Sequence, residues 1–178
     1  MLTLILGTMR SGKSTELIRR MVQLHQNNSN YIFIRNSIDN RNFIARDITL
    51  ADGYKIVDET KLFNNYKGYI LLIDEVQFLD ESLVQRVIEL SLDNDVICAG
   101  LSSMAGSNKL WDSVATLIPF ADSITKLNAM CECCGKIAII HKHLGGAMVG
   151  DNYKVLCLKC FSVENKGVIN EFRKNAKD

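Results

Sequence analysis

Short apolar runs alternate with amphipathic stretches over the first two-thirds of the chain. Each run is four or five residues long and lacks strict alternation, which is typical of strands buried on both faces of a parallel sheet. The runs lie at residues 2–6, 31–34, 69–73 and 96–99, and residues 124–127 are predicted to form a last strand. Residues 14–25 and 83–92 carry apolar side chains at helical spacing. This order predicts an α/β fold with a mainly parallel sheet and helices on both faces.

The pattern changes near residue 128. Five of the six cysteines lie beyond this point, together with a Gly-Gly pair and no long helical stripe before the charged end of the chain. We therefore predict a domain at residues 1–127 and a small module at residues 128–178. The polar, irregular stretch at residues 36–54 is predicted to be a long loop.

Charge and hydropathy exclude some classes of partner. The 21 basic and 20 acidic residues give a net charge of +1, whereas bulk electrostatic binding to nucleic acid or a membrane surface needs an excess of Lys and Arg. No apolar run reaches the ~18–20 residues of a membrane span, and the first residues do not resemble a secretory signal. We expect a soluble cytoplasmic protein without a membrane or nucleic-acid partner, with its cysteines reduced.

Residues 7–14 fit the pattern G-x-x-x-x-G-K-[ST] between a predicted strand and a predicted helix. Glycines let the backbone turn so that N–H groups point at phosphate oxygens, toward which the following helix also directs its positive end. Lys13 supplies charge for the β- and γ-phosphates, and the Ser14 hydroxyl can bind Mg²⁺. The motif predicts a phosphate-loop (RecA-like) ATP site. Its residues are Gly7, Thr8, Met9, Arg10, Ser11, Gly12, Lys13, Ser14 and Thr15.

Two carboxylates, Asp74 and Glu75, follow the apolar run at residues 69–73. In phosphate-loop enzymes an acid at this place holds Mg²⁺, and a neighbouring carboxylate can take a proton from an attacking hydroxyl or water. Successive strand residues point to opposite sides, so the two acids need not share one role. The alternative is a pair of solvated acids, and the pair itself does not decide between water and a substrate hydroxyl as acceptor.

The cysteines form two C-x₂-C knuckles, Cys131 with Cys134 and Cys157 with Cys160. Four thiolates in this pattern predict a closed, structural zinc site, which would stabilise a module too small to bury a large core. A redox pair or free thiols are the alternatives.

The remaining two cysteines and two histidines are predicted to lie outside the zinc site. Cys133 is an additional thiol beside the first knuckle, and Cys98 is predicted to be a small core residue. His141 and His143 are predicted to be surface histidines, because four cysteines already complete the zinc site.

Together these motifs resemble those of the type II thymidine kinase family over nearly the whole chain. Residues 9–17 are similar to its M-x-S-G-K-S-T-E-L, residues 73–78 to I-D-E-x-Q-F, residues 39–41 to D-x-R and residues 117–123 to L-x-P-x-A-[ED]-S. Tyr153 stands four residues before Cys157, as in the family's Y-x-x-V-C. Several matches in the same order make the resemblance more specific than any single motif.

The resemblance implies transfer of the ATP γ-phosphoryl group to the 5′-hydroxyl of thymidine, giving thymidine monophosphate in nucleoside salvage. It implies that Glu75 is the general base, that Asp74 assists Mg²⁺ and that Arg41 steadies the transferring group. It further implies a lasso loop between the cysteine knuckles that covers the base, a homotetramer, and feedback inhibition by deoxythymidine triphosphate (dTTP). The residues expected at the nucleoside are Met9, Phe78, Leu101, Trp111, Val149, Gly150 and Tyr153.

The chain departs from the family on the side of the base. Residues 100–106 lack the Asp and Phe of the family's G-L-D-x-x-F motif, and residues 148–153 of the lasso lack the double glycine at its usual place. Trp111 is expected to replace part of the aromatic wall. Deoxyuridine or a modified pyrimidine deoxynucleoside therefore stays open as a substrate. A phosphate-loop ATPase acting on a macromolecular partner and a degenerate homologue that only binds nucleotide stay open as competing functions.

Overall fold

A six-stranded sheet forms the centre of the computed structural model, which describes residues 1–38, 53–107, 109–146 and 152–165. The strand order is β3-β2-β4-β5-β1-β6, and every neighbouring pair is parallel. The strands are β1 (Leu2–Gly7), β2 (Tyr31–Arg35), β3 (Ile56–Asp58), β4 (Ile70–Ile73), β5 (Asp95–Leu101) and β6 (Ser123–Leu127). The five predicted strands are confirmed, whereas the short β3 was not predicted.

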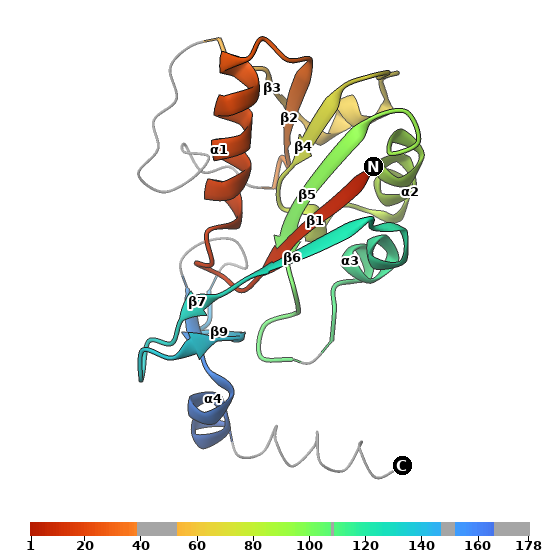
Figure 1. Cartoon of the computed structure of the whole chain (residues 1–178). Helices are drawn as coiled ribbons and strands as arrows, with labels where there is room; N and C mark the ends of the chain where they lie inside the picture. Colours follow the sequence, from red (N-terminus) through yellow and green to blue (C-terminus); the bar gives the residue numbers. More distant parts are fainter. Residues whose placement is uncertain (39–52, 108, 147–151, 166–178) are drawn as a thin grey trace.

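Helices cover both faces of the sheet, as predicted (Figure 1). Helix α1 (Lys13–Gln26) packs on one face, and α2 (Glu81–Leu90) and α3 (Asp112–Leu117) pack on the other. Three short 3₁₀ helices connect these elements: η1 (Glu59–Phe63), η2 (Val76–Phe78) and η3 (Ile118–Phe120). The predicted second helix begins two residues early because the Asp80 carboxylate accepts the Leu83 N–H at 2.9 Å and caps it.

The central strand β1 shows why both faces carry a core. All six of its residues are buried, and successive side chains of a strand point to opposite faces. Leu2, Leu4 and Leu6 join the cluster under α2 and α3, whereas Ile5 joins the cluster under α1. Cys98 lies fully buried in the first cluster, which confirms that it is a core residue.

Beyond Leu127 the strands become short and antiparallel. They are β7 (Ala129–Met130), which pairs with β8 (Ile137–Ala138), and β9 (Ile140–His143), which pairs with β10 (Tyr153–Leu156). Helix α4 (Leu158–Glu164) follows. These elements lie beyond the carboxyl ends of β1 and β6 (Figure 1). They share a small apolar cluster that also receives Met9 from the phosphate loop. The division of the chain at residues 127 and 128 stays a prediction.

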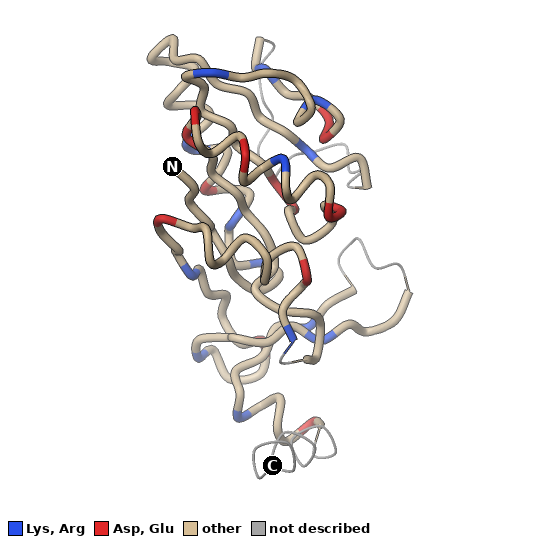
Figure 2. Tube along the Cα trace, turned by 90° about the vertical axis from the view of Figure 1, so that its right-hand side faces the viewer, with Lys and Arg blue, Asp and Glu red and all other residues tan. Residues whose placement is uncertain are grey.

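The surface carries charges of both signs. Figure 2 shows basic and acidic residues interspersed along the described chain, in keeping with the net charge of +1. Within the described residues, no helix is long and apolar enough to span a membrane. Residues 39–52 of the predicted long loop lie outside the described part of the chain.

Candidate active site

The phosphate loop lies between β1 and α1, as the motif requires. Gly7 is packed so closely that a Cβ there would lie 2.4 Å from the Ser11 Oγ and 2.5 Å from the Leu127 carbonyl oxygen. Gly12 has a φ of 83° at the start of α1, where its left-handed conformation favours glycine. Glycine has no side chain with which to cap the helix, and uncapped N–H groups at a helix N-terminus are suited to binding an anion.

Two hydroxyl oxygens of the loop are available to hydrogen-bond a ligand. The Thr8 Oγ1 and the Ser11 Oγ are buried and lack a hydrogen-bond partner among the described residues. Buried hydroxyls are normally paired, so their orphaned state fits a loop that holds a nucleotide phosphate. Lys13 is 7% exposed, and its ammonium donates a hydrogen bond to the Thr8 carbonyl at 2.8 Å. That bond keeps the ammonium group beside the loop.

Asp74 faces the phosphate loop from the end of β4. Its side chain is buried, with 2% exposure, and accepts a hydrogen bond from the Ser14 side chain. Burial, and next the neighbouring Glu75 charge, raise the pKa of Asp74 to about 7, although Ser14 and Lys13 act in the opposite direction. The structure thus brings together the two predicted Mg²⁺ ligands. A hydroxyl and a carboxylate are the hard oxygen donors that Mg²⁺ prefers.

Glu75 has an unusual backbone with a φ of 55°, and its carboxylate is held in place. The Gln77 side-chain amide donates to the Glu75 Oε2 at 2.6 Å, and the Gln77 Oε1 accepts the Leu101 N–H at 3.0 Å. Gly100 makes room for this clamp, because a Cβ there would lie 2.7 Å from Val76 and 3.0 Å from the Gln77 Oε1. Sequence reasoning did not assign Gln77 a role, although it stands in the I-D-E-x-Q-F motif.

An aromatic pair lies next to the carboxylates. Phe78 and Trp111 meet edge to face, with ring centroids 5.8 Å apart. The Trp111 indole N–H donates to the Ser103 carbonyl at 3.1 Å, which fixes the ring on the segment that follows β5. Leu101, at the end of β5, is buried. The structure brings these three predicted nucleoside residues to the same end of the sheet, and their role stays a prediction.

Tyr153 contributes from β10. It is 5% exposed and packs against two histidines, with its ring centroid 5.7 Å from that of His141 and 4.9 Å from that of His143. Burial, and then the charge of Glu75, raise the pKa of Tyr153. The charge of Glu75 therefore acts on Tyr153, and the role of Tyr153 at the nucleoside stays a prediction.

The prediction that His141 lies on the surface was wrong. Its side chain is 1% exposed and packs against the Tyr153 ring of the paired strand β10. His143 is partly exposed. Neither histidine joins the cysteine cluster found among the described residues. Alternating His and Lys residues in β9 gave no hydrophobic signal from which this burial could have been predicted.

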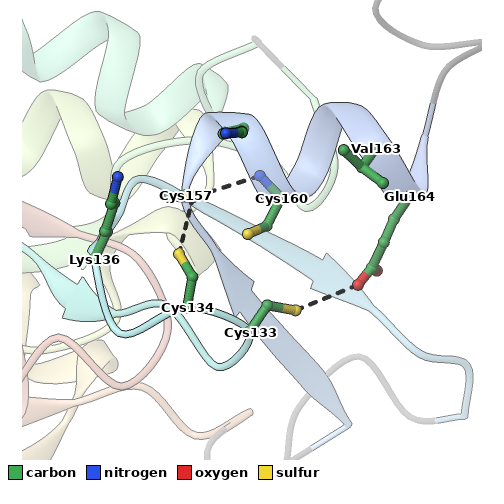
Figure 3. Close-up of a pocket in the computed structure, with 8 residues that line it drawn as sticks. Cys133, Cys134, Lys136, Cys157, Cys160, Val163 and Glu164 are labelled. Atoms are coloured by element: carbon green, nitrogen blue, oxygen red, sulfur yellow. Dashed lines mark hydrogen bonds between the residues drawn. The ribbon is translucent and has the colours of Figure 1, made fainter.

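The four predicted zinc ligands gather in one place, and Figure 3 shows Cys134, Cys157 and Cys160 of this group. The sulfurs of Cys131, Cys134, Cys157 and Cys160 all lie within 4.8 Å of one another, and the Cys134 and Cys157 sulfurs are 3.6 Å apart. A tetrahedral Zn–S₄ site with bonds of ~2.3 Å requires sulfurs about 3.8 Å apart. The donor set and spacing therefore fit zinc. The Cys157 backbone N–H is the main cause of a Cys131 pKa lowered to about 6, whereas hydrogen bonds with Cys134 and then Cys157 raise the pKa of Cys160.

Cys133 lies outside this cluster. Its exposed thiol donates to the Glu164 carboxylate at 3.5 Å, and Figure 3 shows it directed at Glu164 rather than at the other sulfurs. This arrangement agrees with Cys131 and Cys134 as the members of the first knuckle.

An ion pair joins the cysteine knuckle to the phosphate loop. The Arg10 guanidinium lies 2.6 Å from the Glu132 carboxylate, which also accepts the Val155 N–H at 3.1 Å. Sequence reasoning missed this link, because residues 122 positions apart give no local signal. Three predicted site residues, Arg41, Val149 and Gly150, lie outside the described residues.

A phosphate loop at the end of the first strand, with carboxylates at the end of the parallel strand β4, one strand removed from β1 across β5, defines the class of phosphate-loop nucleotide-binding α/β proteins. A family model described as "Thymidine kinase" matches residues 1–161. The chain belongs to the thymidine kinase family.

Curated relatives agree with this assignment. The thymidine kinase of Amsacta moorei entomopoxvirus is 33% identical, covering 89% of this chain and 96% of that protein. The thymidine kinase of Choristoneura fumiferana entomopoxvirus is 32% identical over 91% of this chain and 96% of its own length. The thymidine kinase of Monkeypox virus (strain Zaire-96-I-16) is 29% identical, with 89% and 94% covered. Among solved structures, an ATPase domain aligns with 90% of this chain and 82% of that chain, at a TM-score of 0.45 and 16% identity.

Proposed function

We propose that this protein transfers the γ-phosphoryl group of ATP to the 5′-hydroxyl of thymidine, producing thymidine monophosphate in pyrimidine deoxynucleoside salvage. The observation that carries the proposal is the meeting of Ser14, Asp74 and the clamped Glu75 at one end of the sheet. A phosphate site and a fixed carboxylate are thus adjacent in a member of the thymidine kinase family.

The phosphate side binds and orients the donor. The loop N–H groups and the Lys13 ammonium would hold the ATP phosphates, with the Thr8 and Ser11 hydroxyls as further donors. Ser14 and Asp74 would hold Mg²⁺. When bound, that ion neutralises charge that develops on the phosphoryl oxygens. Arg41 is proposed to steady the same group.

Glu75 is the proposed general base. Its carboxylate would accept the proton of the 5′-hydroxyl as the hydroxyl oxygen attacks the γ-phosphorus. Gln77 restricts the carboxylate to one orientation through its 2.6 Å hydrogen bond. Such fixed geometry lowers the entropic cost of reaching the reactive arrangement.

The nucleoside is proposed to lie against Met9, Phe78, Leu101, Trp111 and Tyr153, with Val149 and Gly150 over the base. The contact between Phe78 and Trp111 supports an aromatic wall despite the altered G-L-D-x-x-F segment. Zinc on the four cysteines would be structural, because four thiolates leave no open coordination position. A cytoplasmic location, a homotetramer and inhibition by dTTP belong to this proposal as family properties.

The test is a direct assay of the purified protein. We expect production of thymidine monophosphate from ATP, Mg²⁺ and thymidine, with slower or no turnover of deoxycytidine. Deoxyuridine and 5-substituted deoxyuridines extend the panel to the competing substrates. Absence of nucleoside monophosphate with every pyrimidine would refute the kinase proposal, and ATP hydrolysis stimulated only by a macromolecule would favour the ATPase function.

A further inference from the structure

The imidazole of His141 is a buried polar group to which neither the fold nor the proposed mechanism assigns a role. It is 1% exposed, and among the described residues neither ring nitrogen has a hydrogen-bond partner. Most buried polar side chains are paired, because an unsatisfied group loses its hydration without compensation. An orphaned imidazole therefore points to a partner that binds from outside the chain.

The strand register places this ring beside Tyr153. Tyr153 pairs with His143, and His141 pairs with Val155, in the antiparallel β9–β10 ladder. Directly opposed residues and residues two apart share one face of such a pair. The His141 and Tyr153 ring centroids are 5.7 Å apart on that face. The backbone is anchored as well, because the Gly106 N–H donates to the His141 carbonyl at 2.7 Å.

Charged groups of the candidate site act on both rings of this face. Burial and then the Lys13 ammonium lower the pKa of His141 to about 4. Burial and then the Glu75 carboxylate raise the pKa of Tyr153. The imidazole thus interacts with the charge of the phosphate-loop lysine and packs on a tyrosine that interacts with the charge of Glu75.

An imidazole in these surroundings is uncharged at neutral pH. It then offers one N–H donor and one bare nitrogen acceptor. Phosphate oxygens already have the Lys13 charge and the loop N–H groups. An uncharged ring is better matched to an uncharged polar group, such as the imide edge of a pyrimidine base or a sugar hydroxyl.

We propose that His141 is a specificity-determining residue that hydrogen-bonds an uncharged polar group of the bound nucleoside. This inference rests on the proposed nucleoside kinase function and adds to it a residue outside the predicted nucleoside set. It explains how a side chain with both nitrogens orphaned is tolerated in the interior of the protein.

The experiment compares His141→Phe with the wild type. Phe keeps a ring beside Tyr153 and removes both hydrogen-bonding atoms. Loss of one such bond should raise the KM for thymidine about tenfold or more, with the KM for ATP unchanged. His141→Asn and His141→Gln place an amide near the position of one ring nitrogen each, and one of them should restore at least part of the thymidine affinity.

Two thymidine analogues identify the group that is recognised. In the wild type, N3-methylthymidine or 3′-deoxythymidine should be phosphorylated less efficiently than thymidine, and in His141→Phe that penalty should shrink. If His141→Phe reduces the penalty for the N3-methyl compound, His141 recognises the base. If His141→Phe reduces the penalty for the 3′-deoxy compound, His141 recognises the sugar. His143→Phe is the matched control, since it changes the other histidine ring that packs on Tyr153. It should leave both penalties unchanged.

The inference is overturned if active His141→Phe keeps the wild-type KM for thymidine and the wild-type analogue penalties. If this variant does not fold, as judged by lost ATP binding, the Asn and Gln variants decide, and wild-type affinity in both would likewise overturn it. No turnover of any nucleoside by the wild type would remove the proposed function itself. Normal wild-type turnover with unaffected variants removes the role of His141 alone.

Discussion

The phosphate side and the nucleoside side of the candidate site are built in different ways. Residues 7–15 form one contiguous stretch of chain, and Asp74 and Glu75 follow a single strand, β4, which β5 separates from β1. The nucleoside side instead combines η2, the segment after β5 and the β9–β10 pair. The first depends on local backbone geometry, whereas the second depends on packing between distant segments. A variant of the phosphate side should therefore change turnover, and a variant of the nucleoside side should change nucleoside affinity.

The largest expected effect comes from Glu75→Gln. The amide keeps the size of the side chain but cannot accept the 5′-hydroxyl proton, so kcat should fall about 10²-fold or more. The KM for thymidine and the affinity for ATP should change little, because neither phosphate nor base contacts are removed. Steady-state kinetics with a separate ATP-binding titration checks this, and near-normal turnover would remove Glu75 as the base.

An intermediate effect is expected from loss of the cysteine site, which holds the strands that carry His141 and Tyr153. Metal analysis should find about one zinc per chain in the wild type, and Cys157→Ser should lose it. Without the metal, β10 is held less firmly in position. The KM for thymidine should then rise about tenfold or more while ATP binding persists, as expected when a positioned contact is lost.

Cys133→Ser is the matched control for this experiment, because its thiol lies outside the four-sulfur cluster and bonds to Glu164. This variant should keep both the metal and the thymidine KM. A wild-type protein that folds stably without any bound metal would contradict the zinc assignment.

The smallest effect concerns the pH dependence of stability without nucleotide or Mg²⁺. Burial, reinforced by Glu75, raises the Asp74 pKa from 3.8 to about 7, so the folded state binds a proton that the unfolded state has released. The stability associated with this proton is fully present below the unfolded pKa and is lost as pH rises through the folded pKa.

Thermal unfolding of the wild type should therefore show a Tm that falls between pH 4 and pH 7 through this group. Asp74→Asn resembles the protonated acid and should remove that part of the decline. Parallel Tm curves for the two proteins would show that the Asp74 carboxyl does not titrate in this range.

The sequence predicted the phosphate side of this site better than the nucleoside side, for a physical reason. The glycines, Lys13 and Ser14 act through a contiguous loop whose conformation depends on their own residue types. Gly100 and Gln77 contact each other from two separate segments, and the Arg10–Glu132 pair joins residues 122 positions apart. Such contacts appear only once the chain has folded.

The secondary structure was likewise predicted well where the sequence signal is local and poorly where it is not. Unbroken apolar runs such as those in β1 and β5 were predicted because burial on both faces leaves little choice of residue. The three-residue β3 and six-residue α3 were not, since segments so short carry too little periodicity. His141 was misplaced because its burial comes from tertiary packing against Tyr153 and not from its own strand pattern.

The position of β1 in the sheet has a consequence for synthesis of the chain. This strand precedes both of its neighbours in the chain, since Leu2 pairs with Val96 of β5 and Thr3 pairs with Ser123 of β6. At ~5–20 residues per second, a ribosome needs several seconds to add the intervening chain. During that time β1 has neither of its pairing partners, and the adjoining phosphate loop lacks the same support. A strand that is synthesised before its neighbours is thus fixed in the sheet only after both of them have been made.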